Sequence, residues 1–417
     1  MIGDSIVKDP SLAPEGHRKI DWVEQHAPVL NRIFAERLSD GALRGRRIAM
    51  TIHLEAKTAY LALLFRRAGA EVTVSGSNPL STQDDVCAAL AERGVRVYAT
   101  HDPSEEEFER YLHLTLETGP EILVDDGAEL VTRLVRHHPD LLGGVRGASE
   151  ETTTGILKLR AMTREGVLSF PVLGANDARM KHLFDNRYGT GHSTIASVMS
   201  NTNLFLSGKA VVVMGFGWVG RGLAKYAAGM GARVIVCEPD PVKLLEAHAE
   251  GYEAMNSLEA ASEGDVFLTG TGNLKVLTRR HFERMKSGAI LANAGHYDHE
   301  VDVAALGEMA RKIREVRRNV TEYELEDGRK LHVLARGRLV NIAAADGHPV
   351  EIMDLTFAVQ ALCAHYIATR AGELEPGLQP IPPEIDETVA RAKLASLGVE
   401  PEELTQEQID YLNSWRY

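Results

Sequence analysis

The strongest fold signal in this chain is the stretch Ala210-Val211-Val212-Val213-Met214-Gly215-Phe216-Gly217-Trp218-Val219-Gly220. Its apolar start predicts a buried strand, and the G-x-G-x-x-G spacing predicts a tight turn into a helix. Gly215 permits the turn, Gly217 lets the backbone approach a pyrophosphate, and Gly220 lets helix and strand pack closely. Phosphate would lie at the helix N-terminus, where free N–H groups favour an anion. The pattern predicts a Rossmann-type dinucleotide-binding unit.

A carboxylate further along the chain narrows the choice of nucleotide. Glu238 follows the next predicted strand, Arg233 to Cys237, and stands 23 residues after Gly215. An acidic residue about 20 residues after the glycines binds the ribose hydroxyls of NAD, and it would repel the extra phosphate of NADP. The spacing therefore predicts NAD as the cofactor. A glycine turn in an unrelated α/β domain is the alternative that the motif alone leaves open.

Strands and helices alternate on both sides of this unit. Such alternation predicts parallel sheets with helices on their faces. The predicted fold class is α/β, with two doubly wound parallel-sheet lobes, a substrate lobe and a Rossmann NAD lobe, plus a short C-terminal arm. The predicted strands before the glycine turn are Arg47 to Ile52, Glu71 to Ser75, Val95 to Ala99 and Glu121 to Asp126, and those after it are Arg233 to Cys237, Asp265 to Thr269 and Ala289 to Asn293.

Two segments look like joints between the lobes. Asn176 to Ser193 is polar and holds a lysine, an aspartate and an asparagine at tight spacing, and Asn341 to Pro349 is rich in alanine and glycine. A polar cluster at the edge of a nucleotide-binding domain is a natural place for a substrate to meet the cofactor. We expect residues 1–180 and 350–380 to form a substrate-binding domain, 190–345 an NAD-binding Rossmann domain, and 381–417 a C-terminal arm.

Composition excludes several classes of partner. The chain has 417 residues and a formal net charge of −13, which argues against nucleic acid or an anionic membrane as partner. No apolar run approaches the ~20 residues that span a bilayer, and Met1 to Pro10 has no signal-peptide pattern. Cys87, Cys237 and Cys363 lack metal-ligand spacing. We expect a cytoplasmic protein with reduced thiols, a small-molecule substrate and no metal.

Several motifs outside the glycine turn follow one another in the order of a known family. They are Ser81 to Asp84, Asp125 to Gly127, Glu150 to Gly155, Asn176 through Lys181 to Asn186, Asn293 to His296, Gly337 to Asn341 and Gly347 to Pro349. On these motifs, over nearly its whole length, the chain resembles the S-adenosylhomocysteine hydrolase family. The resemblance implies a homo-oligomer, most often a tetramer.

The resemblance also implies an NAD-dependent reaction. The thioether of an S-(purine ribosyl)-L-homocysteine is hydrolysed reversibly to a nucleoside and L-homocysteine. Oxidation of the 3′-hydroxyl acidifies the C4′ proton, whose removal expels homocysteine. Addition of water and re-reduction of the ketone complete the cycle, so the cofactor carries the hard step.

Each motif carries a role within this resemblance. Lys181, Asp185 and Glu151 would hold the ribose hydroxyls, and His53 with Asp126 would form the acid–base pair around C4′ and C5′. The implied catalytic residues are His53, Asp126, Glu151, Lys181, Asp185 and His296. The implied cofactor-binding residues are Thr152, Thr153, Thr154, Asn186, Gly215, Gly217, Gly220, Glu238, Asn293 and Asn341, and the implied residues at the purine base are Glu55, Lys57 and His348.

Ordinary structural roles remain open for several of these residues when the resemblance is set aside. His53 could be a structural histidine at a strand end, and Asp126 could cap the next helix. Lys181 and Asp185 are four residues apart and could form a helical ion pair. The run from Thr152 to Thr154 could be a strand or a cap.

The chain departs from the common form of the family at the purine base. Lys57 stands where the common form has a glutamate that accepts from the 6-amino group of adenine. Lysine has donors only, so one group would be left unpaired there, at a cost of about 1–3 kcal/mol. A 6-oxo purine offers an acceptor, and its N1–H could donate to Glu55. S-inosylhomocysteine, used by one branch of the family, is therefore one candidate; the other is S-adenosylhomocysteine, with Lys57 facing solvent or paired with Glu55 or Asp84.

Two smaller departures and two rival functions complete the prediction. The arm ends at Arg416 and Tyr417, which predicts looser cofactor retention than in relatives whose arm reaches a neighbour's NAD, and Thr190 replaces a cysteine with little expected effect.

An NAD-dependent dehydrogenase of the 2-hydroxyacid type would share the cofactor lobe but would accumulate NADH. A non-enzymatic NAD-binding regulator would show broken site motifs or a long N-terminal extension.

Overall fold

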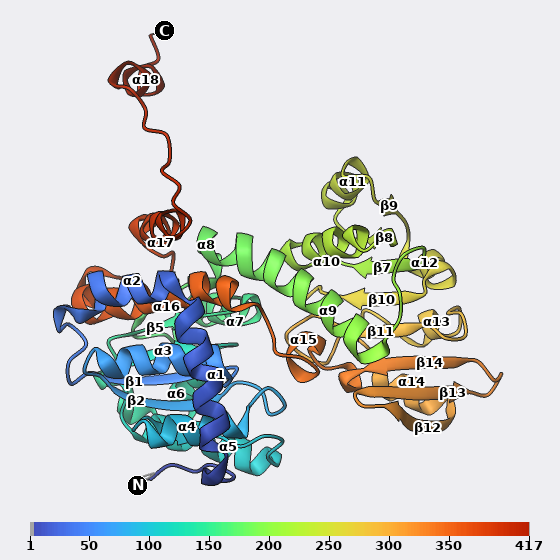
Figure 1. Cartoon of the computed structure of the whole chain (residues 1–417), viewed down its shortest axis with the longest axis horizontal. Coiled ribbons are helices and arrows are strands. Elements are labelled where there is room, and N and C mark those ends of the chain that lie inside the picture. Colours follow the sequence, from blue (N-terminus) through green and yellow to red (C-terminus); the bar gives the residue numbers. More distant parts are fainter. Residues whose placement is uncertain (1–3, 417) are drawn as a thin grey trace.

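The computed structural model describes residues 4–416, which form two α/β lobes and a projecting arm (Figure 1). This arrangement confirms the predicted fold class. Met1, which begins the segment considered for a signal peptide, and Tyr417, which ends the predicted arm, lie outside the described residues.

Seven parallel strands form the sheet of the first lobe. They are β1 (Arg47–Ile52), β2 (Glu71–Gly76), β3 (Arg96–Tyr98), β4 (Ile122–Asp125), β5 (Gly147–Glu150), β6 (Pro171–Leu173) and β15 (Gly377–Gln379), in the spatial order β15-β6-β5-β4-β1-β2-β3. The strands are almost wholly buried, because helices cover both faces of the sheet. These helices are α1 (Ala13–His26), α2 (Pro28–Glu36), α3 (Ala56–Arg67), α4 (Asp84–Glu92), α5 (Glu105–Glu117), α6 (Glu129–His137), α7 (Thr153–Arg164) and α16 (Val350–Arg370).

The second lobe contains an eight-stranded sheet built around the glycine turn. Its strands are β7 (Ala210–Met214), β8 (Arg233–Cys237), β9 (Glu253–Ala254), β10 (Val266–Thr269), β11 (Ile290–Asn293), β12 (Ala310–Arg317), β13 (Val320–Leu325) and β14 (Lys330–Leu334), in the order β12-β13-β14-β11-β10-β7-β8-β9. Six of these strands run parallel, from β14 to β9, as predicted for a Rossmann lobe. Its helices are α10 (Trp218–Gly229), α11 (Pro241–Ala249), α12 (Ser257–Glu263), α13 (Arg279–Phe282) and α14 (Val303–Met309).

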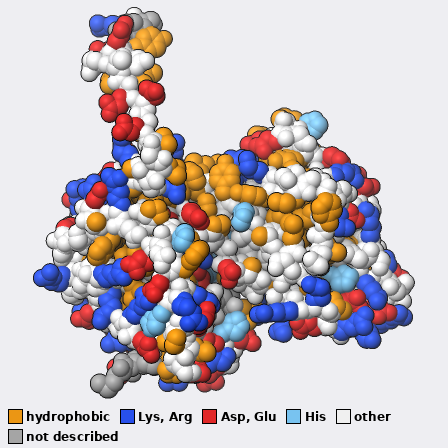
Figure 2. All heavy atoms as spheres, in the orientation of Figure 1, with side chains coloured by type: hydrophobic (Ala, Val, Ile, Leu, Met, Phe, Trp, Pro, Cys, Tyr) orange, Lys and Arg blue, Asp and Glu red, His pale blue; other side chains and the backbone are white. Residues whose placement is uncertain are grey.

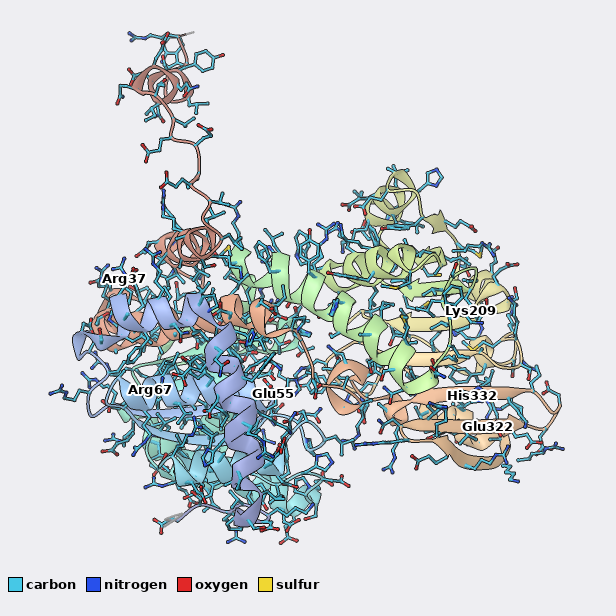
Figure 3. All side chains as sticks on the ribbon, viewed as in Figure 1. Arg37, Glu55, Arg67, Lys209, Glu322 and His332 are labelled. Atoms are coloured by element: carbon cyan, nitrogen blue, oxygen red, sulfur yellow. The ribbon has the colours of Figure 1, made fainter. Side chains whose placement is uncertain are left out.

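An antiparallel hairpin at one edge of the second sheet was not predicted from the sequence. Strand β12 pairs with β13, and β13 pairs with β14, both antiparallel. Glu322 on β13 lies opposite Arg314 on one side and His332 on the other, and Figure 3 places Glu322 and His332 together on this hairpin. Opposite charges across strands stabilise such pairs, so they help to hold the exposed edge strand β12 on the more deeply buried strand β13.

The joint between the lobes contains an unusual helix. Short helix α8 (Arg179–Lys181) runs into a π-helix, His182–Gly189, and then into α9 (Thr190–Thr202). Helix α10 packs against this segment through glycine, because a Cβ added at Gly222 would lie 1.8 Å from the carbonyl oxygen of Arg187. Close backbone contact therefore fixes the π-helix on the second lobe. π-Helical turns are frequently found at functional sites.

The chain returns to the first lobe through α15 (Val340–Ala343) and helix α16. The segment Val350–Glu373 is the one helix in residues 4–416 that is long and apolar enough to cross a membrane by length and composition. The sequence analysis expected no such run. However, 78% of its apolar window is buried inside the protein, and α16 packs in the core of the first lobe together with α2 and α3. Strand β15 then pairs with β6 at the edge of the first sheet.

The C-terminal segment ends in two helices of different character. Helix α17 (Pro383–Ser396) buries Ile385, Val389 and Ala392 against the first lobe. Helix α18 (Gln406–Leu412) has no buried residue, and Figures 1 and 2 show it standing clear of both lobes. The exposed apolar side chains of this region are Leu404, Ile409, Tyr411, Leu412 and Trp415.

Candidate active site

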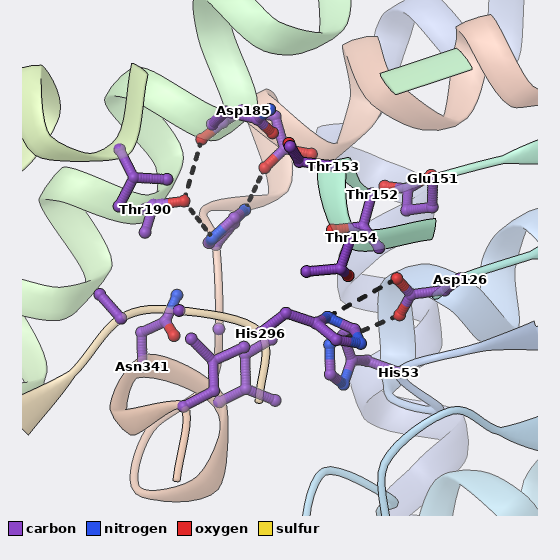
Figure 4. Close-up of a pocket in the computed structure, with 18 of the residues that line it drawn as sticks. His53, Asp126, Glu151, Thr152, Thr153, Thr154, Asp185, Thr190, His296 and Asn341 are labelled. Atoms are coloured by element: carbon purple, nitrogen blue, oxygen red, sulfur yellow. Dashed lines mark hydrogen bonds and ion pairs between the residues drawn. The ribbon is translucent and has the colours of Figure 1, made fainter. Parts of the chain in front are cut away.

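A cavity of about 310 Å³ is lined by residues from both lobes (Figure 4). In the first lobe, His53 follows β1, Asp126 follows β4 and Glu151 follows β5, so all three lie at the carboxyl edge of the sheet. Ligands of open parallel sheets bind at this edge, because the loops after the strands converge there. The second lobe contributes Gly217 from the glycine turn and His296 from the loop after β11.

Two histidines face one carboxylate inside the cavity. His53 Nε2 lies 3.6 Å from Asp126 Oδ2, and His296 Nδ1 lies 3.9 Å from Asp126 Oδ1. The hydroxyl of Ser81 donates to the carbonyl of Asn78, so it accepts from Nδ1–H of His53 at 2.8 Å. This assignment leaves a lone pair on His53 Nε2, directed at Asp126. Burial lowers the pKa of His53 to about 4, so the imidazole is neutral at pH 7 and can act as a base.

A lysine and two carboxyl groups form the second polar group of the cavity. Lys181 Nζ lies 3.1 Å from Asp185 Oδ2 and 3.9 Å from Glu151 Oε1. Burial raises the pKa of Glu151 to about 8, although the Lys181 charge opposes the shift. Burial would also raise the pKa of Asp185, but the charges of Lys181 and His348 hold it below its usual value. At neutral pH the cluster therefore holds a lysine ammonium, an ionised Asp185 and a protonated Glu151.

Helix α16 supplies two supporting residues that the sequence analysis missed. Thr356 Oγ1 donates to Asp185 Oδ2 at 2.8 Å, and Gln360 Nε2 donates to Glu151 Oε2 at 2.6 Å. The amide oxygen of Gln360 in turn accepts from Ser149 Oγ at 2.6 Å. The available signal was a threonine and a glutamine four residues apart in an otherwise apolar helix, because buried polar groups need partners.

Two of the three residues expected at the purine base, Glu55 and Lys57, form an ion pair in the cavity wall. Lys57 Nζ lies 2.7 Å from Glu55 Oε2 and also donates to the carbonyl of Asp346 at 2.9 Å. Glu55 caps α3, because its carboxylate accepts from the backbone N–H groups of Lys57 and Thr58. The pairing of Lys57 with Glu55 is one of the arrangements that were expected from the sequence for an S-adenosylhomocysteine substrate. Lysine has three donor hydrogens, and these two contacts leave one of them for a ligand.

His348 connects the return segment to the π-helix. Its Nδ1 lies 2.5 Å from Asp185 Oδ1, and its Nε2 lies 3.3 Å from Thr190 Oγ1. Thr190 also donates to the backbone carbonyl of Asp185 at 3.4 Å. The two chain crossings between the lobes therefore meet at Asp185, beside the cavity.

The glycine turn has the geometry that a dinucleotide requires. Gly215 has φ +96°, which favours glycine, and a Cβ added at Gly220 would lie 1.9 Å from the carbonyl oxygen of Gly215. A Cβ added at Gly217 would meet no atom of residues 4–416 within 4 Å, so the turn is open to a ligand there. Glu238 Oε2 accepts from the N–H of Phe216 at 2.6 Å, which places the carboxylate beside the turn. These features fit a bound NAD.

Two polar atoms in the cavity wall, on Asn341 and Thr154, are buried without a hydrogen-bond partner among the described residues. Asn341 Nδ2 donates to Ser193 Oγ at 2.9 Å, whereas Asn341 Oδ1 is buried without a hydrogen-bond partner among the described residues. Thr154 Oγ1 is in the same condition. Both residues line the cavity. Because buried polar atoms are normally paired, these two fit the carboxamide and ribose of a nicotinamide riboside.

The cavity brings together most but not all of the predicted site residues. All six predicted catalytic residues and all three predicted base residues line it, as do Thr152, Thr153, Thr154, Asn186, Gly217 and Asn341. Gly215, Gly220 and Glu238 belong to the glycine turn and its surroundings but do not line the cavity. Asn293 is fully buried, and its amide holds its own loop through Gly295 and the carbonyl of Tyr297. The individual roles of all these residues remain predictions.

Comparison with known families agrees with this geometry. A family model described as S-adenosyl-L-homocysteine hydrolase matches residues 4–141, and a second, described as S-adenosyl-L-homocysteine hydrolase, NAD binding domain, matches residues 186–347. The chain belongs to the S-adenosyl-L-homocysteine hydrolase family. Membership confirms the resemblance inferred from the motifs and identifies NAD as the cofactor of this hydrolase.

Curated relatives of this hydrolase match it over almost the full length. It is 53% identical over 414 residues to an adenosylhomocysteinase of Thermococcus kodakarensis, covering 99% of this chain and 98% of the relative. It is 54% identical over 414 residues to an adenosylhomocysteinase of Pyrococcus abyssi, with the same coverage. It is also 50% identical over 414 residues to an S-inosyl-L-homocysteine hydrolase of Methanopyrus kandleri, again covering 99% and 98%. Relatives with two different purine substrates in their names are thus about equally similar to this chain.

Proposed function

We propose that this hydrolase cleaves the thioether of an S-(purine ribosyl)-L-homocysteine reversibly to a nucleoside and L-homocysteine. The observation that carries the proposal is the convergence of an acid–base group and a hydroxyl-binding group on one cavity beside the glycine turn. When bound, NAD would supply the hydride chemistry at C3′ of the substrate, and the glycine turn, Glu238 and Asn341 would hold it. The residues of this chain would hold the ribose and move the protons.

The lysine cluster fits the 3′-hydroxyl. Burial would lower the pKa of Lys181, but the ionised carboxylate of Asp185 raises it, so the lysine stays charged. Its ammonium can donate to the 3′-oxygen and favour loss of the hydroxyl proton during oxidation. Ionised Asp185 accepts from a ribose hydroxyl, and protonated Glu151 donates to one. The cluster therefore orients the ribose and stabilises charge at O3′.

The His53–Asp126 pair fits the elimination and hydration steps. Neutral His53 presents the Nε2 lone pair to the cavity, as a base must if it is to accept a proton. Asp126 lies between His53 and His296, so it can stabilise a proton on either imidazole. We propose that this pair takes the C4′ proton and protonates the departing sulfur.

Thiol release tests the proposed function. Purified protein with NAD is incubated with S-adenosylhomocysteine and, separately, with S-inosylhomocysteine, and free homocysteine is measured with a thiol reagent. The expected result is thiol release without net accumulation of NADH, because the cofactor is restored in each turnover. Net NADH formation from a 2-hydroxyacid, with no thiol release, would instead support the dehydrogenase alternative.

For the base, we propose that Lys57 favours hypoxanthine over adenine. The support is that Lys57 lines the cavity, keeps one N–H beyond its two contacts, and stands where the common form of the family has a glutamate. A 6-oxo group accepts that hydrogen bond, whereas a 6-amino group opposes it. The variant Lys57→Glu should reverse the preference, by about 10-fold or more in kcat/KM for an unpaired buried group. Preference of the unchanged protein for the adenosyl compound would overturn this assignment.

Three further properties belong to the same proposal. We propose that the protein is a homotetramer and that the exposed apolar side chains of the arm pack on another copy of the chain. We also propose that it acts in the cytoplasm and has no nucleic-acid or membrane partner. We also propose the domain division of residues 1–180 with 350–380, 190–345, and 381–417. Light scattering of the full chain and of a chain ending at Ser396 measures the first property, with a smaller assembly expected for the shorter chain.

A further inference from the structure

Three ligand atoms in the cavity approach one another at distances that suit a metal ion better than hydrogen bonds. His53 Nε2, His296 Nδ1 and a carboxylate oxygen of Asp126 all lie within 4.8 Å of one another. The separations of 3.6 Å for His53 and 3.9 Å for His296 from Asp126 exceed the ~2.7–3.2 Å of an N–H···O hydrogen bond. Figure 4 shows the two imidazoles reaching this carboxylate, one from each lobe.

The surroundings hold two of the three ligands, His53 and Asp126, in the form that binds metal. His53 Nδ1–H donates to Ser81 Oγ at 2.8 Å, which leaves Nε2 unprotonated and fixes the plane of the ring. Ser77 Oγ donates to Asp126 Oδ2 at 2.7 Å and orients the carboxylate. Metal-ligating histidines almost always donate their other N–H in this way, and ligating carboxylates are hydrogen-bonded in turn.

We propose that His53, Asp126 and His296 form a site for a divalent transition-metal ion, with Zn²⁺ as the preferred ion. Zinc bonds to nitrogen and oxygen at ~2.0–2.2 Å, so tetrahedral ligand atoms stand about 3.3 Å apart. The separations of the two imidazole nitrogens from Asp126, 3.6 Å and 3.9 Å, reach that spacing with movements of a few tenths of an ångström per side chain, and all three ligand atoms already lie within 4.8 Å of one another. Two imidazoles and one carboxylate leave a fourth position open to the cavity, as in zinc sites with three protein ligands.

This site has no sequence signature, because its ligands come from three distant segments. His53 follows β1, Asp126 follows β4 and His296 follows β11 of the other lobe. The expectation of no metal was drawn from cysteine spacing and did not test such an arrangement. Because the ligands come from both lobes, a bound ion would also hold the lobes together.

Occupancy of the site has a chemical consequence that rests on the proposed function. Zinc would occupy the Nε2 lone pair of His53 and the Asp126 carboxylate, which are the groups proposed to move the C4′ proton. The ion therefore inhibits thiol release reversibly, and a chelator restores it. Substrate fills the same cavity, so inosine or adenosine and the ion compete.

Cobalt binding to the NAD-loaded protein tests the site without relying on activity. Co²⁺ at a four- or five-coordinate nitrogen and oxygen site absorbs visible light far more strongly than the hydrated ion. We expect one Co²⁺ to bind per chain and Zn²⁺ to displace it. Loss of a residue that only supports a ligand weakens metal binding by about 10-fold to 100-fold. Loss of a ligand itself, in His53→Ala or His296→Ala, should therefore weaken Co²⁺ binding by about 100-fold or more. Ser81→Ala, which removes only the orienting hydroxyl, should weaken binding by about 10-fold.

A second histidine cluster provides the matched control. His113 Nδ1 lies 2.8 Å from His138 Nε2 on the surface of the first lobe, so His113→Ala tests non-specific binding to imidazole. This variant should bind Co²⁺ like the unchanged protein. Absence of the absorption band in the unchanged protein, or its persistence in both His53→Ala and His296→Ala, would overturn the site. If those variants do not fold, loss of the band on adding inosine or adenosine to the unchanged protein decides the same point.

The outcomes for the site and for the proposed function can be separated. Cobalt binding with no thiol release from either thioether would keep the site and overturn the function. Thiol release that is insensitive to Zn²⁺, from a protein without the cobalt band, would overturn the site and keep the function.

Discussion

Glu151 is the side chain whose protonation state most directly controls the charge of the cavity. Burial raises its pKa to about 8, and the carboxyl lies near ionised Asp185 and the Lys181 ammonium. As the pH rises through 8 the group loses its proton, which adds a second negative charge beside Lys181 and removes a donor for the ribose.

We expect the alkaline limb of kcat/KM to fall near pH 8 for this reason. The variant Glu151→Gln keeps a neutral donor of the same shape, so its alkaline limb should move to higher pH. Thiol release measured from pH 6 to pH 10 on both proteins checks this. If the variant keeps its limb near pH 8, the titrating group lies elsewhere.

Helix α10 and the π-helix form a contact that depends on one missing methyl group. A Cβ at Gly222 would lie 1.8 Å from the carbonyl oxygen of Arg187. Since the π-helix carries Asp185 and Asn186, a shift of this contact displaces both side chains from the cavity.

The variant Gly222→Ala should therefore lose stability and activity together. Overpacking of this kind costs about 1–3 kcal/mol, which lowers the thermal midpoint and increases KM. Gly229→Ala, on the same helix, is the control, because its Cβ would meet no atom of residues 4–416 within 4 Å. Equal melting temperatures for Gly222→Ala and the unchanged protein would show that the helices can move apart without cost.

The strands of the second sheet differ in how well they could be predicted. Strands β7 and β8 were predicted to the residue, because buried parallel strands are continuous apolar runs between turn signals. The hairpin strand β12 was missed, since Ala310–Arg317 is exposed and mostly charged and is held by cross-strand pairs. The Asp327-Gly328 turn after β13 was the available signal.

The site could be predicted in part, because several of its residues stand in motifs that resemble those of the family. His53, Asp126 and Glu151 were predicted in this way, and the structure places each of them directly after a strand, at the ligand edge of the first sheet. The role of Gln360 could not be predicted, because it depends on which face of α16 turns toward Glu151. Nor could the approach of His296 to Asp126 be foreseen, since it depends on how the two lobes meet.

The lobes meet at a polar contact next to the cavity. Lys158 Nζ on α7 donates to the hydroxyl of Tyr297 at 2.8 Å, and that hydroxyl lies 3.3 Å from Glu129 Oε1 on α6. Tyr297 belongs to the second lobe and directly follows His296. The contact therefore holds the loop that carries His296 against the first lobe.

Loss of the single hydroxyl in Tyr297→Phe should loosen this closure. The hydroxyl makes two hydrogen bonds across this contact. At a net value of about 1 kcal/mol for each bond, KM should rise by about 5-fold to 30-fold, and small-angle scattering should show a larger radius of gyration. Tyr226→Phe, within the second lobe, is the control and should change neither. An unchanged radius and KM in Tyr297→Phe would mean that other contacts fix the lobes.

The return of the chain through α16 and β15 has a consequence for biosynthesis. The first sheet receives its last strand, and its core receives its longest helix, only after the whole second sheet has been synthesised. On the ribosome, the dinucleotide-binding lobe can therefore fold while its neighbour still lacks an edge strand and a central helix. A nascent chain released before residue 350 would expose the apolar surface of the unfinished lobe, and it would be a natural client for a chaperone.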